Sequence, residues 1–299
     1  MAPTKVKESM ATDYSIIEVR DNERIRQIIE VQRLAWQRDS YSMVSPTILK
    51  TLATHGGTLF GAISPSQQLV GYVFGFPAIG KNRFLYFHSH QLGVLPAHQN
   101  KNIGTALKTA QYEYCEKIGI PVITWTYDPL TSVNSQVNFS KMHVIGRTYR
   151  ADYYGERNDI YNIDLPTDRL EVELWLTPSL EESLKKLKKN IKDKYGKTET
   201  SQLWAFPTNP LPALEKIKVE TRDEPVFIPV PGDFLQVKKN DIEMLKQWRF
   251  VVRQVYERLI AKSYVAVEFW RSVTPSNPST MIWVPADDIE TLPEKFIEV

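Results

Sequence analysis

Two histidines separated by one residue, His88 and His90, are the side chains in this sequence whose types and spacing most suggest chemistry. They lie in the apolar run FLYFHSHQLGVLP, which has the composition of a β-strand. Successive side chains of a strand point to opposite faces, so both histidines should project from the same face. Histidine exchanges a proton near neutral pH, which makes either residue a candidate general base. The alternative is that both are structural.

A polar turn follows this strand and leads into a helix. The segment LGVLPAHQNKNIGTAL begins as a strand, turns after Pro96 and starts a helix near Gly104. The first N–H groups of a helix have no internal partner and bind anions, and a glycine there lets a phosphate come close. Asn102 tolerates left-handed geometry and can replace a glycine in the turn. The pattern predicts a phosphate site, with an ordinary connection as the alternative.

The first half of the chain alternates between strand and helix patterns, and these elements must position the turn and the histidines. We expect a helix capped by Asp21, a shorter one starting at Pro46, and one that ends at Gly119. The predicted strands are YSIIEVR, TLFGAIS, LVGYVFGFP, the histidine strand, PVITWTY and GRTYRADYYG, with a short helix in SVNSQVNFSKM. This order predicts an α+β fold in which an antiparallel meander leads into one β-α-β crossover.

The second half has its own strand and helix patterns. We place a boundary near Pro166, which gives a first domain at 1–165 and an α+β extension at 166–299. The extension should contain the strand RLEVELWLT, a charged helix, a proline-rich loop with short edge strands at 206–231, an amphipathic helix at 241–262, and the strands YVAVEFW and STMIWVP. The lysine run KKLKKNIK is typical of a solvated helix face, with contact to nucleic acid or to a ligand phosphate as alternatives.

Composition limits the classes of partner. The 299 residues include 37 basic and 35 acidic side chains, so a net charge of +2 provides no broad basic face for nucleic acid. Cys115 is the only cysteine, which excludes an internal disulfide and a cysteine zinc site. No apolar run has membrane-spanning length and the N-terminus has no signal-peptide pattern, so we expect a cytoplasmic protein without a membrane partner.

The strand and turn together resemble the cofactor motif of the GNAT acyltransferase superfamily over about residues 14–155. Leu92, Gly93 and Val94 match the strand of that motif, and Gln99, Asn102 and Gly104 occupy its signature positions, with asparagine in place of the usual glycine at 102. The resemblance implies a mixed, mostly antiparallel sheet flanked by helices, a coenzyme A pyrophosphate held by the turn, and a pantetheine arm bonded to the strand. It assigns cofactor contacts to Leu92, Gly93, Val94, Gln99, Asn100, Lys101, Asn102, Ile103, Gly104 and Thr105.

A second family segment resembles NSQVNFSKMHV. Asn134 and Lys141 keep the family's positions and are expected to contact the cofactor. Phe139 stands where the family often has a tyrosine that protonates the leaving thiolate, so the acid must come from elsewhere. Tyr153 is our candidate for that acid, and its neighbours Tyr149 and Tyr154 are alternatives; all three are also ordinary strand residues.

The motifs LGVLPAHQNKNIG, ITWTYDPL and PTDRL together resemble a longer subgroup of GNAT enzymes, some of which acylate amino acids with succinyl-CoA. In PTDRL, Arg169 beside Asp168 is a candidate to hold a substrate carboxylate, with a surface ion pair as the alternative. The resemblance implies an acetyl-CoA or succinyl-CoA donor and no metal.

The expected activity is N-acylation of an amine by direct attack on acyl-CoA. An amine must lose a proton to attack, and the pair His88 and His90 resembles the proton relay of arylalkylamine acetyltransferases. Cys115 lies on the motif helix away from the expected thioester, so we expect no acyl-enzyme. Two alternatives stay open: a non-catalytic acyl-CoA sensor and an interaction scaffold. The C-terminal half is expected to complete the pocket or to form a homodimer interface.

Overall fold

The computed structural model describes residues 14–36, 43–213 and 224–297, and these divide into two compact units. Of the described residues, the first unit contains those up to Trp125 with Arg157–Ile163, Phe296 and Ile297, and the second contains those of Thr126–Glu156 and Asp164–Lys295. The predicted boundary between a first domain at 1–165 and an extension at 166–299 stays a prediction.

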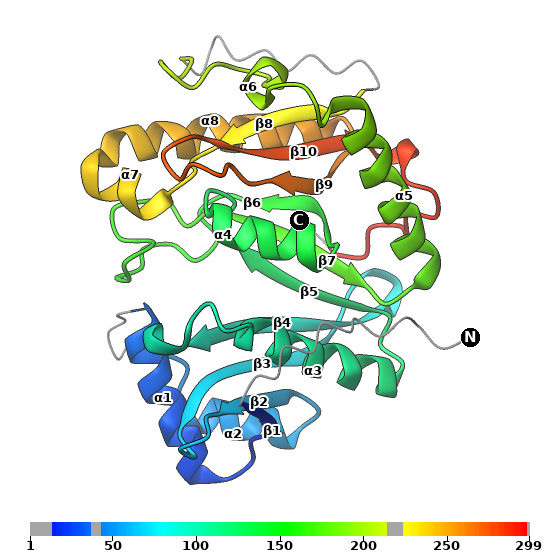
Figure 1. The fold of residues 1–299 in the computed structure, drawn as a ribbon. Coiled ribbons are helices and arrows are strands. Elements are labelled where there is room, and N and C mark those ends of the chain that lie inside the picture. Colours follow the sequence, from blue (N-terminus) through cyan, green and yellow to red (C-terminus); the bar gives the residue numbers. More distant parts are fainter. Residues whose placement is uncertain (1–13, 37–42, 214–223, 298–299) are drawn as a thin grey trace. The chain divides into compact units, whose positions relative to one another are not determined.

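The first unit is built on a sheet with the strand order β1-β2-β3-β4-β5. β1 to β4 are antiparallel neighbours, and β5 runs parallel to β4 because α3 carries the chain back across the sheet (Figure 1). The predicted meander and the single β-α-β crossover are therefore confirmed. The strands are β1 (Ser15–Glu18), β2 (Thr58–Ile63), β3 (Leu69–Ile79), β4 (Leu85–Val94) and β5 (Val122–Tyr127).

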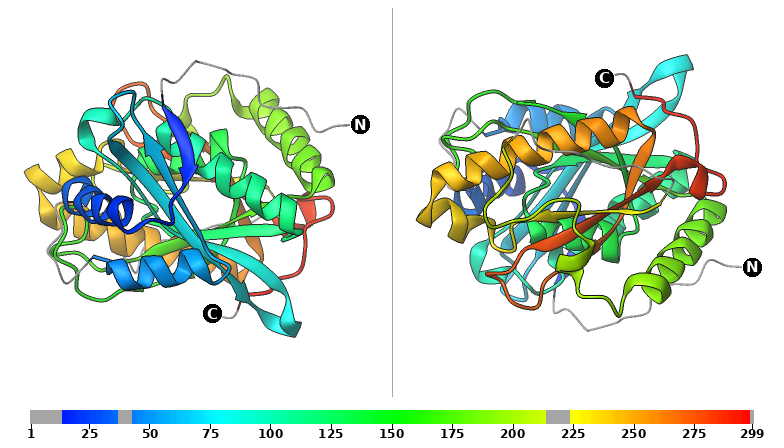
Figure 2. Two further views of the ribbon diagram at one scale, coloured as in Figure 1. Left: turned by 90° about the horizontal axis from the view of Figure 1, so that it is seen from below. Right: turned by 90° about the horizontal axis from the view of Figure 1, so that it is seen from above.

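Three helices cover this sheet, namely α1 (Asn22–Trp36), α2 (Pro46–Thr54) and α3 (Ile103–Ile118). Two of them start where the sequence predicts: the Asp21 carboxylate accepts a hydrogen bond from the N–H of Arg24, and Pro46 is the first residue of α2. α1 and α3 lie on opposite faces of the sheet, as the two further views show (Figure 2). On the α1 face the Trp36 and Tyr72 rings meet edge to face, and on the α3 face Tyr114 packs on Phe87.

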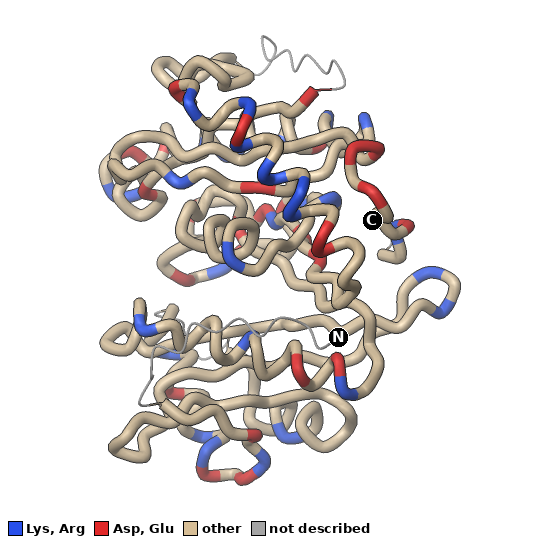
Figure 3. Tube along the Cα trace, turned by 45° about the vertical axis from the view of Figure 1, so that its right-hand side comes forward, with Lys and Arg blue, Asp and Glu red and all other residues tan. Residues whose placement is uncertain are grey.

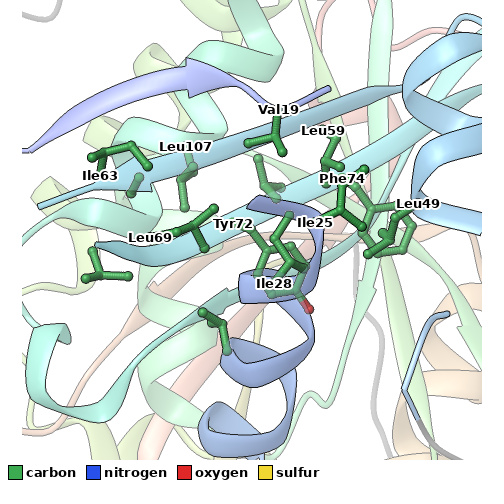
Figure 4. Packing of buried hydrophobic residues seen from close by; sticks show 14 of the residues in the cluster. Val19, Ile25, Ile28, Leu49, Leu59, Ile63, Leu69, Tyr72, Phe74 and Leu107 are labelled. Atoms are coloured by element: carbon green, nitrogen blue, oxygen red, sulfur yellow. The ribbon is translucent and has the colours of Figure 1, made fainter. Parts of the chain in front are cut away.

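The core of the first unit fills the space between β2, β3 and the helices. Its apolar side chains come from both faces of β3 and recur at helical spacing on α1 (Figure 4). Its members include Val19, Ile25, Ile28, Leu49, Leu59, Ile63, Leu69, Tyr72, Phe74 and Leu107. This packing fixes β3, and β3 in turn fixes the histidine strand β4 beside it.

The strands of the second unit follow one another in the order β7-β6-β9-β10-β8. Its strands are β6 (Ile145–Arg150), β7 (Arg169–Trp175), β8 (Val226–Val230), β9 (Tyr264–Trp270) and β10 (Ser279–Pro285). Its helices are α4 (Ser132–Ser135), which continues as the π-helix Gln136–Lys141, then α5 (Pro178–Tyr195), α6 (Thr200–Leu203), α7 (Phe234–Asn240) and α8 (Ile242–Ala261). The sheet is antiparallel at its paired strands, so the predicted α+β class holds in both units.

Two helices of this unit pack against the sheet. Apolar residues of α5 join Ile282 and Val284 in one cluster, whereas the Tyr256 ring of α8 meets the Trp283 ring with centroids 4.6 Å apart. Ile282 and Trp283 are consecutive in β10, so α5 and α8 lie on opposite faces. Trp248 belongs to the buried face of α8, as its spacing predicts.

Two sequence predictions need correction in this unit. The strand predicted through GRTYRADYYG ends at Arg150, because Asp152 and Gly155 adopt positive φ and turn the chain. The lysine run of α5 is not uniformly solvated. Charges of both signs follow α5 in Figure 3, but Lys188 is buried and donates to the Phe139 carbonyl.

Candidate functional site

A β-bulge in β4 places the two histidines. Phe74 pairs with Gln91 and Gly75 pairs with Ser89, so His90 is the extra residue on β4. A bulge bends a strand and redirects a side chain, which is why bulges recur next to functional sites. The His88 and His90 ring centroids lie 6.0 Å apart. The structure therefore brings the two predicted bases together.

Aromatic side chains of β3 surround this pair. The Phe76 ring lies 5.7 Å from His88 and 6.3 Å from His90, and the Phe74 ring lies 5.3 Å from His90. His88 is half-buried and its Nδ1 lies 3.1 Å from the Thr124 hydroxyl of β5, whereas His90 is exposed. The His88 imidazole thus has a hydrogen-bond partner on β5, and the His90 side chain is exposed to solvent.

The predicted phosphate turn has the expected backbone. Asn100 and Asn102 adopt left-handed geometry, with φ of 61° and 58°, so two asparagines serve where glycine would be the easier residue. α3 begins directly afterwards at Ile103, and no side chain caps it. Its first N–H groups are therefore available to an anion, as the helix geometry requires.

Space is also available at this turn. A Cβ added to Gly104 would meet only the Leu92 side chain, at 3.6 Å, so a ligand can approach the backbone there. The exposed Gln99 side chain donates to the carbonyl of Val94, which ties the turn to the end of β4. Lys101 is exposed and its ammonium lies 3.4 Å from the Tyr14 hydroxyl, so one cation stands beside the turn.

β4 and β5 part after a short ladder. Within the described residues, their pairing consists of Phe87 with Ile123 and His88 with Thr124. β4 continues to Val94, and its pairs with β3 occupy only one of its two edges. The other edge of Leu92, Gly93 and Val94 can thus pair with an extended chain that carries amide groups. This edge leads from the turn to the histidines.

A group that the sequence interpretation missed lies where the two strands part. Lys108 of α3 donates to the Ser89 hydroxyl of β4 at 2.6 Å, and its ammonium lies 3.8 Å from the Trp125 ring centroid of β5. Ser89 donates in turn to Gln111, whose amide donates to Thr58. In the sequence, Lys108 is marked only by its position next to Leu107, a buried residue of the helix.

The remaining predicted cofactor residues belong to the second unit. Asn134 is exposed on α4, and Lys141 is exposed at the end of the π-helix. Phe139, in the place of the family's tyrosine, is fully buried. Contacts of Asn134 and Lys141 with the same ligand as the turn stay a prediction.

The three tyrosines have different surroundings. Tyr149 is buried and donates to the Asp168 carboxylate at 2.6 Å; burial and Asp168 raise its pKa well above the ordinary value. The Tyr154 hydroxyl lies 3.1 Å from that of Thr126. Tyr153 is 44% exposed under the Arg150 guanidinium, and partial burial raises its pKa. Tyr153 is thus the accessible phenol among them, and its role as the acid stays a prediction.

Arg169 lies inside the second unit. It is 8% exposed, donates to the Asp168 carbonyl and lies 3.8 Å from the Asp128 carboxylate. The alternative of a surface ion pair is therefore wrong, because burial removes the pair from water. Asp168 itself accepts two hydrogen bonds from Arg253. A carboxylate ligand of Arg169 would compete with Asp128, and this binding role also stays a prediction.

The described residues form neither a metal cluster nor a membrane-spanning helix. Among residues 14–36, 43–213 and 224–297, no three histidine, cysteine or acidic side chains gather as a metal site would require. None of the helices in this part of the chain is both long and apolar enough for a bilayer.

Comparison with known proteins finds one family that resembles part of the chain. Residues 22–136 match the model of the acetyltransferase (GNAT) family. This segment is less than half of the chain, and it is similar to that family. The matched segment contains the bulge, both histidines, the turn and α3. The match supports an acyl-CoA-dependent N-acetyltransferase, and no curated protein sequence matches the chain.

Solved structures resemble about half of the chain at low identity. A NatC complex bound to Gag peptide and CoA has a TM-score of 0.45 and 14% identity, and the match covers 56% of this chain and 100% of that one. The ribosomal-protein-S18-alanine N-acetyltransferase of Escherichia coli has a TM-score of 0.41 and 13% identity, and the match covers 55% of this chain and 94% of that one. An aminoglycoside acetyltransferase from an uncultured soil metagenomic sample, in complex with sisomicin, has a TM-score of 0.37 and 17% identity. That match covers 41% of this chain and 82% of that one. These TM-scores lie below 0.5, so they add no argument about function.

Proposed function

We propose that this protein transfers an acetyl or succinyl group from acyl-CoA directly to an amine, with amino acids as the acceptor class. One observation carries the proposal: the edge of β4 that leads from the phosphate turn to the paired histidines. Its length from Ser89 to Val94 is about 17 Å at the usual rise of a strand, which suits an extended pantetheine arm. The turn would hold the pyrophosphate and the histidines would face the thioester end.

The chemistry assigned to the site is direct transfer. His88 or His90 accepts a proton from the acceptor amine, directly or through water, and the neutral nitrogen attacks the thioester carbonyl. Cys115 is fully buried, and burial raises the pKa of its thiol to about 12. A thiolate at that position is therefore disfavoured, which supports transfer without an acyl-enzyme.

Two measurements test this function. Calorimetry with acetyl-CoA and with succinyl-CoA should show binding of one of them, and thiol release in the presence of an amino-acid panel should identify the acceptor. Binding without turnover on any amine would favour the alternative of an acyl-CoA sensor, which the buried Phe139 in place of a tyrosine supports. Absence of binding to either thioester would contradict both and leave an interaction scaffold.

A further inference from the structure

Lys108 occupies the point where β4 and β5 separate. Ser89 and Trp125 directly follow the last paired residues His88 and Thr124, and the Lys108 ammonium contacts both of them. Ser89 and Trp125 are 2% and 6% exposed, so the ammonium is held between two buried partners. A cation in this place is costly unless the protein uses it, because its partners are a hydroxyl and an aromatic ring.

The charged groups around Lys108 are few. No carboxylate of the described residues lies within ion-pair distance of its ammonium. On α3 the nearby titratable group is the Cys115 thiol. On β2 the nearby polar group is the neutral Thr58 hydroxyl, which is linked to Ser89 through Gln111. β4 contributes Ser89, and the His88 and His90 rings lie on the opposite face of the sheet, which carries Phe76. Burial lowers the pKa of Lys108 to about 7, partly opposed by Cys115. Lys108 can therefore release a proton at neutral pH.

The proposed function requires a proton donor at this place. A ligand chain that follows the β4 edge from the turn ends where β4 meets β5, next to Ser89. A thiolate that leaves there needs a proton, and Phe139 cannot supply one. Lys108 is the ammonium in the described part of the chain that contacts both strands at this point.

We propose that Lys108, in place of Tyr153, is the proton donor to the thiolate that leaves acyl-CoA, an inference that rests on the proposed function. The amine nitrogen forms its bond to the acyl carbon, the carbon–sulfur bond breaks, and the sulfur takes a proton from the Lys108 ammonium. The base on β4 takes the proton that the amine loses. Solvent then returns a proton to Lys108 and removes one from the base, so atoms and charge balance.

The test uses Lys108→Met, Lys108→Arg and the control Lys117→Met, which changes an exposed lysine of the same helix. Arginine keeps a cation over Trp125 but does not release its proton. We expect both Lys108 variants to lower the single-turnover rate at neutral pH about 100-fold, as loss of an acid does. Acetyl-CoA binding should stay at the wild-type level, and the control should behave as wild type.

The pH profile separates this role from a structural one. In the wild type, the rate should fall as pH rises through the range in which Lys108 loses its proton, and neither Lys108 variant should show that fall. Full activity of Lys108→Arg, or a wild-type profile without the fall, would overturn the inference even if Lys108→Met does not fold. Failure of the wild type to bind either acetyl-CoA or succinyl-CoA would instead contradict the proposed function.

Discussion

At the scale of single residues, the paired histidines carry the chemistry that is easiest to test. His88 is oriented by Thr124, His90 stands on the bulge, and their rings lie 6.0 Å apart. Two bases this close can share a task, so a single substitution is partly masked. The informative change removes both titratable rings at once.

The double variant His88→Gln, His90→Gln should lower turnover by about 10²- to 10⁴-fold, because general-base catalysis is lost. Acetyl-CoA affinity should be unchanged, and the rise of rate with pH through the histidine range should disappear. Steady-state rates across pH measure this, with the exposed His55→Gln as the matched control. A folded double variant with full turnover and the same profile would show that the pair is structural.

Asp128 forms a buried ion pair with Arg249 in the second unit. Burial disfavours its charge, but the Arg249 guanidinium, bonded at 2.8 Å and itself 1% exposed, holds the pKa of Asp128 below its ordinary value. Asp128→Asn leaves Arg249 buried without its charge partner, so we expect a loss of about 3–5 kcal/mol in the free energy of unfolding.

The stability that the Asp128 carboxylate contributes depends on pH. A carboxyl with a depressed folded pKa stabilises the protein above its unfolded value of about 4, and this stability is lost as pH falls toward the folded value. Urea unfolding at several pH values should show that acid loss in the wild type and a smaller one in Asp128→Asn. The exposed Asp287→Asn is the control. Equal stability of wild type and variant would refute the role of the pair.

At the scale of elements, the strand, turn and helix from β4 to α3 act together as the proposed anion site. Gly104→Val places a branched side chain where only Leu92 is now near, so the fold should tolerate the change. The same side chain would occupy the space that a bound phosphate needs. Coenzyme A affinity should fall more than about tenfold, or 1.4 kcal/mol. Calorimetry measures the loss, and Thr109→Val, on an exposed position of the same helix, is the control. Unchanged affinity in a folded Gly104→Val protein would exclude the turn.

At the scale of the whole molecule, the two compact units interleave along the chain. Residues 1–165 include β6, but its neighbours β7 and β9 lie after Pro166. Expressed alone, this fragment should lose thiol release, because β6 is left without its sheet and exposes the buried Ile145. Activity assays and sedimentation of the fragment and the full chain measure this. A soluble, fully active fragment would show that the second half is dispensable, and a monomeric full chain would remove the proposed dimer interface.

The sequence alone determined the local elements. The cap at Asp21, Pro46 at the start of α2 and the stop at Gly119 all depend on neighbouring residues, so their patterns predicted them. The left-handed turn at Asn102 was also predictable, because few residues tolerate that geometry.

Tertiary structure decided what depends on partners far along the chain. The bulge at His90 exists only in the register between β3 and β4, and the burial of Arg169 follows from Asp128 on another segment. Lys108 looked like an ordinary helical lysine, because its distinction comes from Ser89 and Trp125 on two separate strands. Hydrogen-bond register and desolvation are set by contacts in space, and a linear pattern of residue types does not contain them.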